Sequence, residues 1–448
     1  MRGVVAALNT SGKYAYKAPD LAVDFLVIGG GVIGLAIAQR LSRRYPNKTT
    51  FLVERHSRPG EEISSRNSEV IHSGLYYPPG SLKTRLCLRG RDLLYERCET
   101  YNIPHRRLGK LVVALPHQQG YIEGLHAKSL KLKWPAHSNN TTTPVLPTEL
   151  ITGNQAREYE PSLSPDIVGA LWCPMTGIVD SHGLMASFEM DIKNSEGGHL
   201  VYSSRVVRVD PYKRIAKASN STDLQAAEDG WVVQTITGKG KERDAFLART
   251  LINASGLSST VILNSILPPE LRIPMYHARG SYASYRGPDI AGISHLIYPC
   301  PETHGTTYGF HSLGTHLTLD LQGRIKFGPD LEWISPRLEM ESPDEELAEF
   351  WSEYLVPDSS RIHDMHAAVK SYLPGIVLEG FQPDYVGIRP KITGPQHGFQ
   401  DFTFRQDYPS LDTRNPMISL LNIESPGLTS CMAIAEYLVE DILEKGVA

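Results

Sequence analysis

The pattern of hydrophobic and polar positions near the start of the chain predicts a strand, a helix and a second strand. Residues 25–28 (Phe-Leu-Val-Ile) form a continuous apolar run with β-branched members, which is typical of a strand buried on both faces. Ile33, Ile37 and Leu41 then recur every four residues, which predicts a helix with one apolar face. Residues 49–53 (Thr-Thr-Phe-Leu-Val) predict a second buried strand.

Glycines occupy the turn between the first strand and the helix. Gly29, Gly31 and Gly34 fit the pattern G-x-G-x-x-G, in which the first permits a tight turn, the second admits a diphosphate and the third lets the helix pack closely on the strand. Glu54 ends the second strand, 20 residues after Gly34, where a carboxylate accepts hydrogen bonds from ribose hydroxyls. The combination predicts a dinucleotide site at the helix N-terminus.

Later segments predict more strands and a final helix. The β-rich segments are 200–209, 230–236 and 246–253. In residues 316–320 the leucines alternate with polar residues, which predicts one strand of a hairpin. Ile434, Leu438 and Ile442 recur at helical spacing after Pro426, so a loop is expected to lead into a helix there.

Composition narrows the class of protein. A chain of 448 residues with 41% hydrophobic residues predicts two or three domains and excludes a disordered protein. Lys and Arg number 45 against 49 Asp and Glu, and no basic stripe is present, which argues against a nucleic-acid partner. The longest apolar run, residues 25–38, is 14 residues long and contains four glycines, so no transmembrane segment is expected.

The cysteines and the N-terminal residues give information about the cellular compartment of the protein. The five cysteines form no C-x-x-C pair, which predicts free thiols in a reducing compartment and no metal site. The first nineteen residues contain Arg2, Lys13 and Lys17 and no acid. We interpret them as a disordered tail rather than a weak mitochondrial presequence, and the choice between cytoplasm and mitochondrion stays open.

The glycine pattern does not distinguish FAD from NAD, and the segment after the second strand is more informative. Residues 64–77 combine hydrogen-bond donors with a Val-Ile pair, which suits a loop beside a flavin ring. This chain resembles the D-amino-acid-oxidase-type FAD-dependent oxidoreductases and, among them, the L-2-hydroxyglutarate dehydrogenases. The resemblance is carried by residues 66–80, 297–301, 314–324, 328–330 and 423–430.

The resemblance implies an α/β protein of two lobes. One is a doubly wound, Rossmann-like FAD-binding domain, and the other is an α+β substrate domain whose mixed sheet covers the flavin. The FAD-binding domain is expected to comprise residues 21–112, 171–260 and 373–448. The substrate domain is expected to comprise residues 113–170 and 261–372.

The motifs and the resemblance together imply the residues that hold FAD. The helix after Pro426 would direct its N-terminus at the flavin pyrimidine edge and stabilise the reduced flavin. The expected cofactor-binding residues are Gly29, Gly31, Val32, Ile33, Gly34, Glu54, Arg55, Ser65, Arg66, Asn67, Ser68, His72, Val206, Ser255, Gly256, Gly387, Arg389, Pro426, Gly427, Leu428 and Thr429.

Oxidation of a 2-hydroxy acid needs a base for the hydroxyl proton, a cation for the carboxylate and a C–H directed at flavin N5. His316 and His72 are both candidate bases. Each has the alternative of a structural role, and His72 is also a candidate for covalent attachment of the flavin. Arg389 is the candidate cation, because a guanidinium pairs with a carboxylate through two hydrogen bonds; glycine and sarcosine oxidases carry a similar Gly-x-Arg-Pro. Lys391, Tyr282, Tyr298 and Arg279 complete the expected pocket.

The resemblance therefore implies an FAD-dependent dehydrogenase that oxidises a small-molecule 2-hydroxy acid, L-2-hydroxyglutarate to 2-oxoglutarate. Electrons would pass to a quinone, a carrier or oxygen. The alternatives are an amine or amino-acid oxidase that uses oxygen, including one of secondary metabolism, and a flavoprotein whose FAD is structural or relays electrons.

Overall fold

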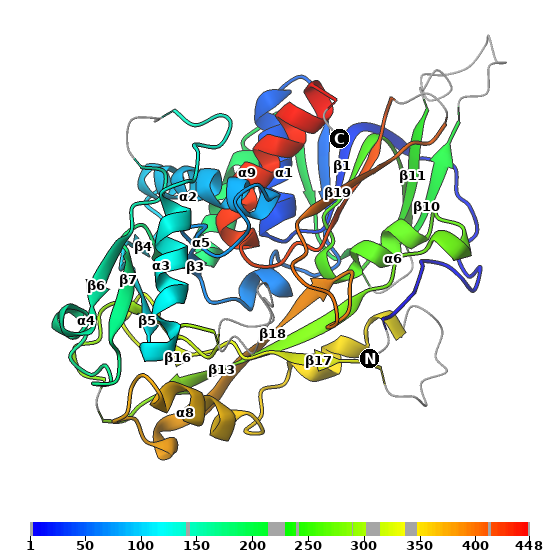
Figure 1. Cartoon of the computed structure of the whole chain (residues 1–448). Helices are drawn as coiled ribbons and strands as arrows, with labels where there is room; N and C mark the ends of the chain where they lie inside the picture. Colours follow the sequence, from blue (N-terminus) through cyan, green and yellow to red (C-terminus); the bar gives the residue numbers. More distant parts are fainter. Residues whose placement is uncertain are drawn as a thin grey trace, which may run out of the picture.

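The computed structural model describes residues 3–139, 144–213, 229–238, 242–288, 290–301, 314–336, 347–410 and 414–446. Two large sheets dominate it (Figure 1). The helices are α1 (Val32–Arg44), α2 (Leu82–Tyr101), α3 (Gln119–Ser129), α4 (Gly153–Tyr159), α5 (Ser181–Lys193), α6 (Ser259–Asn264), α8 (Ile362–Lys370) and α9 (Gly427–Glu436), the last continued by a π-helical segment (Tyr437–Glu444). Short 3-10 turns lie at Ile63–Ser65, Pro116–Gln118, Gly256–Ser258, Pro269–Leu271, Phe350–Leu355 and Leu378–Gly380.

The first sheet has eight strands and contains the predicted strand–helix–strand unit. Its order is β10 (Ser204–Tyr212), β11 (Gly230–Thr237), β12 (Glu242–Asn253), β1 (Leu21–Ile28), β2 (Thr50–Val53) and β9 (Gly198–Val201). β20 (Met417–Leu421) pairs with β12, and β19 (Thr403–Asp407) pairs with β20. β1 runs parallel to β2 and β12, β2 to β9, and β12 to β20, whereas β10, β11 and β12 form an antiparallel meander.

Both faces of the parallel core are covered, which explains the unbroken apolar run in β1. Successive side chains of a strand point to opposite faces. Val27 packs with helices α1, α2, α5 and α9, whereas Leu26 and Ile28 pack on the other face with Ile262 of α6. Helices on both faces of a parallel sheet make this a doubly wound α/β domain, as the sequence predicts.

The second sheet has nine strands and is mixed. Its order is β17 (Glu332–Ile334), β13 (Tyr276–Tyr285), β16 (Ile325–Phe327), β15 (Leu317–Leu319), β14 (Leu296–Pro299), β5 (Lys110–Ala114), β7 (Gly169–Cys173) and β6 (Glu149–Thr152), with β18 (Phe381–Lys391) beside β13. A small third sheet joins β3 (Val70–Ile71), β8 (Gly177–Val179) and β4 (His105–Arg106). In Figure 1 the long strands β13 and β18 cross the lower half of the molecule, and α1, α2 and α9 lie above them.

The sheet to which a strand belongs differs in two places from the domain segments expected from the sequence. β18 lies in the nine-stranded sheet, although the sequence assigns residues 373–448 to the FAD-binding domain. β7 spans the expected boundary after residue 170 and also belongs to the nine-stranded sheet. We propose that the substrate domain includes both strands, because their backbone partners are there.

The N-terminal residues are ordered, so the expectation of a disordered tail is wrong for residues 3–19. Val4 forms an antiparallel bridge with Met275, and Asn264 donates a hydrogen bond from Nδ2 to the carbonyl oxygen of Ala6 over 2.9 Å. Ala7 and Tyr14 are buried. Small apolar side chains let this segment pack against α6 and the start of β13, a long-range contact that local composition does not reveal.

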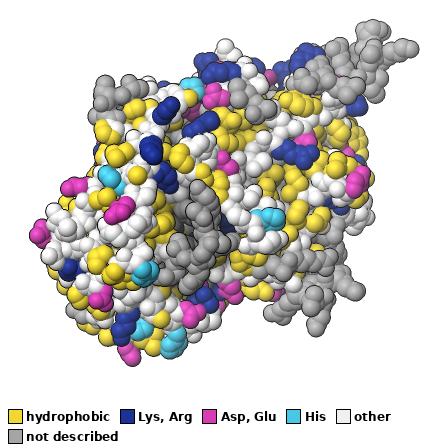
Figure 2. Space-filling view, viewed as in Figure 1, with side chains coloured by type: hydrophobic (Ala, Val, Ile, Leu, Met, Phe, Trp, Pro, Cys, Tyr) yellow, Lys and Arg dark blue, Asp and Glu magenta, His cyan; other side chains and the backbone are white. Residues whose placement is uncertain are grey.

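Surface and thiol features complete the description. All five cysteines are buried, and no disulfide joins any two of them. Within the described ranges, every helix is too short or too polar to cross a bilayer. On the face in Figure 2, positive and negative side chains lie interspersed with hydrophobic ones.

Candidate active site

The turn between β1 and α1 is shaped by its glycines. Gly29 has φ +106°, a conformation that a side chain disfavours. A Cβ on Gly34 would lie 1.9 Å from the carbonyl oxygen of Gly29, so only glycine lets α1 start this close to the strand. A Cβ on Gly31 would lie 3.0 Å from Oγ of Ser64, a tight contact that Ser64 could relieve only by shifting.

Glu54 is fixed at the end of β2. Its Oε2 accepts a hydrogen bond from the backbone N–H of Gly30 over 2.6 Å, and its Oε1 accepts one from the N–H of His56 over 2.8 Å. The carboxylate is buried and lines a cavity. Each oxygen keeps a further lone pair, so the group can still accept a hydroxyl hydrogen bond.

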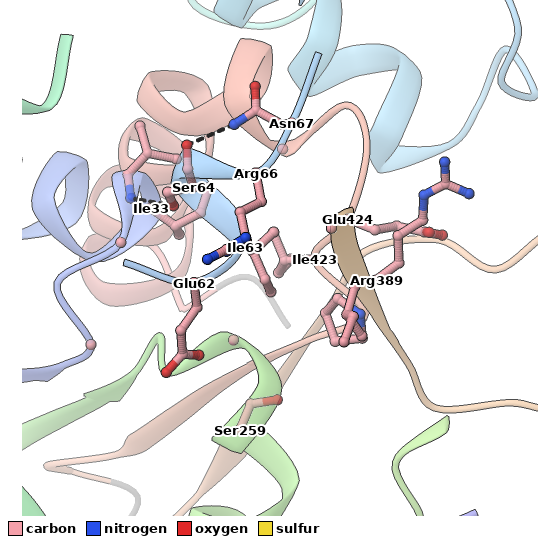
Figure 3. A pocket seen from close by; sticks show the side chains of 18 of the residues that line it. Ile33, Glu62, Ile63, Ser64, Arg66, Asn67, Ser259, Arg389, Ile423 and Glu424 are labelled. Atoms are coloured by element: carbon pink, nitrogen blue, oxygen red, sulfur yellow. Dashed lines mark hydrogen bonds between the residues drawn. The ribbon is translucent and has the colours of Figure 1, made fainter. Parts of the chain in front are cut away.

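A cavity of about 380 Å³ extends from this turn to the nine-stranded sheet. In Figure 3, Ile33, Ser64 and Asn67 lie on one side of the view, and Arg389 and Glu424 lie on the other. The cavity therefore joins a cofactor end, beside the glycine turn, to a substrate end, beside β14 and β18.

Most of the expected cofactor-binding residues line this cavity. They are Gly29, Gly31, Val32, Ile33, Glu54, Arg55, Arg66, Asn67, Ser68, His72, Val206, Ser255, Gly256, Gly387, Arg389, Pro426, Gly427 and Leu428. Gly34, Ser65 and Thr429 are absent from the lining. Gly34 acts by packing, and Thr429 accepts a hydrogen bond at Oγ1 from the N–H of His72 over 2.9 Å, which fixes the loop that carries the histidine.

The cofactor end also contains residues that the sequence motifs missed. Ser64 accepts a hydrogen bond at Oγ from the N–H of Val32 over 2.9 Å, in the first turn of α1. Arg55 forms ion pairs with Glu62 and with Glu349, the second over 2.6 Å. Glu349 is distant in sequence, so no local motif could have linked it to Arg55.

His316 lies at the substrate end with a defined tautomer. Its ring stacks on that of Tyr298, with centroids 3.9 Å apart. Nδ1 lies 3.1 Å from the carbonyl oxygen of Gly314. Because a carbonyl oxygen only accepts hydrogen bonds, Nδ1 carries the proton, and Nε2 keeps its lone pair. Burial lowers the pKa of His316 to about 3, which keeps the ring neutral at neutral pH.

His72 lines the same cavity. It belongs to residues 64–77, the loop expected beside the flavin, which we call the flavin loop. Its Nε2 lies 3.3 Å from Oγ of Ser425, which lies 3.3 Å from Oη of Tyr77. Burial also lowers the pKa of His72 to about 3. Both histidines are neutral, and they differ in that His72 has a hydroxyl neighbour at the nitrogen that would accept a proton.

The remaining wall of the cavity contains three cationic side chains and one acidic side chain. Arg389 lines the cavity, and no described residue forms a hydrogen bond or ion pair with its guanidinium. Glu424 accepts hydrogen bonds at Oε1 from Nζ of Lys391 over 2.7 Å and from Nζ of Lys83 over 3.0 Å. Burial alone would raise the pKa of Glu424, but Lys83, Lys391 and Arg389 lower it to about 2. The carboxylate is therefore ionised; it pairs with the two lysines, and Arg389 lowers its pKa without forming an ion pair.

The expected tyrosines line the cavity, whereas Arg279 does not. Tyr298 is fully buried, and its hydroxyl has no hydrogen-bond partner among the described residues. Burial raises the pKa of Tyr282 to about 12, so this hydroxyl stays protonated. The expectation that Arg279 completes the pocket is wrong, because its guanidinium pairs with Glu332 over 3.0 Å and with Asp358 over 2.8 Å.

Comparison with known proteins identifies the family. The FAD dependent oxidoreductase family, DAO, matches residues 24–441. This chain belongs to the DAO family of FAD-dependent oxidoreductases. It is 32% identical to the mitochondrial L-2-hydroxyglutarate dehydrogenase of Arabidopsis thaliana, over 94% of this chain and 83% of that protein. It is 26% identical to L-2-hydroxyglutarate dehydrogenase of Escherichia coli, over 94% and 93% of the two chains.

Solved structures of the same family confirm the fold. The L-α-glycerophosphate oxidase of Mycoplasma pneumoniae, solved with FAD bound, matches with a TM-score of 0.68 and 20% identity over 93% of this chain and 94% of that chain. Glycine oxidase of Geobacillus kaustophilus matches with a TM-score of 0.65 and 17% identity over 95% of both chains. The α/β fold expected from the sequence is confirmed.

FAD is the cofactor of this DAO-family chain, and the residues present fit it. The side-chain-free turn at Gly29 and Gly31 leaves room for a diphosphate, and Glu54 offers lone pairs for ribose hydroxyls. Elsewhere in the described chain, no cluster of three or more His, Cys, Asp or Glu side chains has the arrangement of a metal site.

Proposed function

We propose that this DAO-family enzyme oxidises L-2-hydroxyglutarate to 2-oxoglutarate. The observation that carries the proposal is the substrate end of the cavity, where three side chains line one space: a neutral histidine, an arginine and a tyrosine hydroxyl. Within the described part of the chain, Nε2 of the histidine, the guanidinium and the hydroxyl have no hydrogen-bond partner. The relatives at 26–32% identity that carry the name L-2-hydroxyglutarate dehydrogenase support it.

Each of these residues has one role in the proposed reaction. Arg389 binds the carboxylate next to the reacting carbon through its guanidinium. Nε2 of His316 accepts the hydroxyl proton, and Tyr298 donates a hydrogen bond to the substrate. FAD supplies the acceptor for the hydride that leaves C2. The C2–H bond breaks, its electron pair leaves with the hydrogen, and the C2–O bond becomes a carbonyl as the proton moves to His316.

Charge favours a dicarboxylate. The cations Arg389, Lys391 and Lys83 outnumber the anion Glu424 and Asp401, which lies beside Lys83, so this wall keeps an excess of positive charge. A second carboxylate on the substrate therefore meets a favourable charge here, whereas a monocarboxylate leaves that charge unbalanced. An unpaired buried charge is costly, so the second carboxylate is a source of specificity.

The alternative of an amine or amino-acid oxidase has weaker support. Relatives named as oxidases of amino acids match at 17% identity and share the fold alone. We also propose a reducing compartment, cytoplasm or mitochondrion, because no disulfide joins any two of the five cysteines.

Anaerobic reduction of the bound flavin tests the proposal. L-2-Hydroxyglutarate is expected to bleach the oxidised flavin absorbance, and 2-oxoglutarate is expected to accumulate in equal amount. L-2-Hydroxyvalerate, which lacks the second carboxylate, should reduce the flavin much more slowly. If glycine, sarcosine or L-amino acids bleach the flavin and the hydroxy acids do not, the proposed function is wrong.

A further inference from the structure

A buried lysine lies behind the proposed base and has no part in the reaction described above. Lys110 is 1% exposed, and no described carboxylate forms an ion pair with it. Its Nζ lies 4.4 Å from the ring centroid of Tyr76 and 4.7 Å from that of Tyr298. Holding an ammonium group in such surroundings is costly, and the aromatic faces offset part of that cost.

Sheet register explains why this lysine lies beside the base. Lys110 of β5 pairs with Leu296 of β14, so Tyr298, two residues on, points to the same face of the sheet. Ile297 pairs with Leu317 of β15, which places His316 opposite Tyr298. Four neighbouring strands thus present Cys173, Lys110, Tyr298 and His316 side by side on the face that lines the cavity.

The contacts form a continuous column. The rings of Tyr76 and Tyr298 lie 6.4 Å apart and are nearly parallel, at 12°. Nζ of Lys110 lies over both rings, and His316 stacks on Tyr298. A charge at Lys110 therefore acts on the imidazole through a ring and not through water, so screening is weak.

We propose that Lys110 is a positioning residue for the reaction: its buried positive charge, acting across Tyr298, disfavours a second positive charge on His316 and so holds the base in its proton-accepting form. This proposal rests on the proposed function for its consequence in catalysis. The same charge makes a protonated His316 short-lived, so the proton is released and the base is ready for the next substrate.

Other charged and titratable groups face this column from the elements packed against it. They are His72 and Tyr77 of the flavin loop, Cys87 of α2, Tyr121 of α3, Cys173 of β7, Tyr282 of β13, Cys300 after β14, Tyr372 after α8 and Arg389 of β18. Burial raises the pKa of Cys87 to about 12 and of Cys173 to about 11, so both thiols are neutral. Burial lowers the pKa of Lys110 to about 8, so the lysine is charged at neutral pH and below.

The test measures the protonation of His316 directly in the FAD-loaded protein. Histidine is labelled with ¹³C, the His316 signal is assigned from its loss in His316→Asn, and the protein is titrated from pH 8 to pH 3. In the wild type His316 is expected to stay neutral at pH 5. In Lys110→Met the midpoint is expected to rise by about one pH unit, because a nearby cation is removed.

Lys326→Met is the matched control. Lys326 also lies over a tyrosine ring, that of Tyr385 at 4.8 Å, but it pairs with Asp384 and lies outside the column. This substitution is expected to leave the His316 titration unchanged. Equal shifts in both lysine variants, or no shift in Lys110→Met, would overturn the proposal.

If Lys110→Met fails to fold, the wild-type titration still tests the proposal, because a wild-type His316 that titrates at pH 6.5 or above contradicts it. The titration needs no turnover, so it is separable from the proposed function. Where L-2-hydroxyglutarate reduces the flavin, the acid limb of kcat/KM should move to higher pH in Lys110→Met and stay fixed in Lys326→Met. An unmoved limb would overturn the role in catalysis.

Discussion

The glycine turn and the acid at the cofactor end of the cavity come from one short stretch of chain, whereas the side chains proposed for chemistry at the substrate end do not. The glycine turn, the start of α1 and Glu54 all lie within residues 29–54. At the substrate end, His72, Tyr298, His316 and Arg389 come from the flavin loop, the nine-stranded sheet and its hairpin. A local motif therefore suffices to find the first end, whereas the second exists only once the strands have paired.

The difference also separates binding from chemistry. Glycines act at the cofactor end by leaving out side chains, so substitutions there should disturb flavin binding and stability. Side chains at the substrate end act by charge and proton transfer, so substitutions there should leave the flavin bound and slow its reduction.

His316→Asn is expected to have the largest effect. Loss of the proposed base should lower the rate of anaerobic flavin reduction by about 10²–10⁴-fold while the flavin stays bound, as measured by stopped-flow absorbance. His72→Asn should cause a smaller loss, because its Nε2 has Ser425 as a neighbour. The reverse ranking would assign the base to His72.

Arg389→Met is expected to follow, with kcat/KM for L-2-hydroxyglutarate lowered by about 10²-fold, because the substrate carboxylate loses a buried cationic partner. Arg389→Lys keeps the charge but not the paired hydrogen bonds, so it should recover part of the loss. Steady-state kinetics with a dye acceptor measures both. Unchanged kcat/KM in Arg389→Met would place the carboxylate elsewhere.

Gly34→Ala should destabilise the cofactor end by about 3 kcal/mol and lower the flavin content, because the new methyl group meets the carbonyl oxygen of Gly29. Urea unfolding and the ratio of flavin to protein absorbance measure the two effects. Gly80→Ala is the control, since an added Cβ there has no atom within 4 Å. Equal behaviour of the two variants would mean that the turn is less tightly packed than described.

Glu424→Gln is expected to have the smallest effect, and that effect depends on pH. The pKa of Glu424 is about 2 in the folded state, below the usual value, so its ionisation stabilises the fold above about pH 4.5 and this stabilisation is lost as the pH falls toward 2. In the wild type this group should contribute about 2 kcal/mol to the difference in unfolding free energy between pH 5 and pH 3. The variant should lack that contribution, and an identical pH dependence would contradict the pairing with Lys83 and Lys391.

The features that the sequence alone predicts differ between the two ends of the cavity in the same way. The spacing of Gly29, Gly31, Gly34 and Glu54 predicts the strand, turn, helix and acid that the structure contains, because all four act within one local unit. The hairpin at 316–320 and the helix after Pro426 are likewise confirmed. The ordered N-terminal segment and the Arg279 ion pairs were missed because their partners are distant in sequence.

Burial decides the rest of the site, and burial is not visible in a local pattern. The alternation at 316–320 predicts a polar face, yet His316, Thr318 and Asp320 are all buried, and of the three only His316 lines the cavity. Lys110 lies in a strand and Glu424 in a loop, and no sequence motif marks either residue. Their importance comes from low exposure together with the charges around them, which only the fold brings together.

Stopped-flow anaerobic mixing of the FAD-loaded protein with L-2-hydroxyglutarate and with its 2-deuterated form tests the central claim most directly, that one cavity places the C2–H of a 2-hydroxy dicarboxylate next to the flavin. We predict complete bleaching, slowed severalfold by deuterium at C2, with 2-oxoglutarate as the product. Flavin that stays oxidised in the presence of L-2-hydroxyglutarate, while an amine reduces it, would contradict the account.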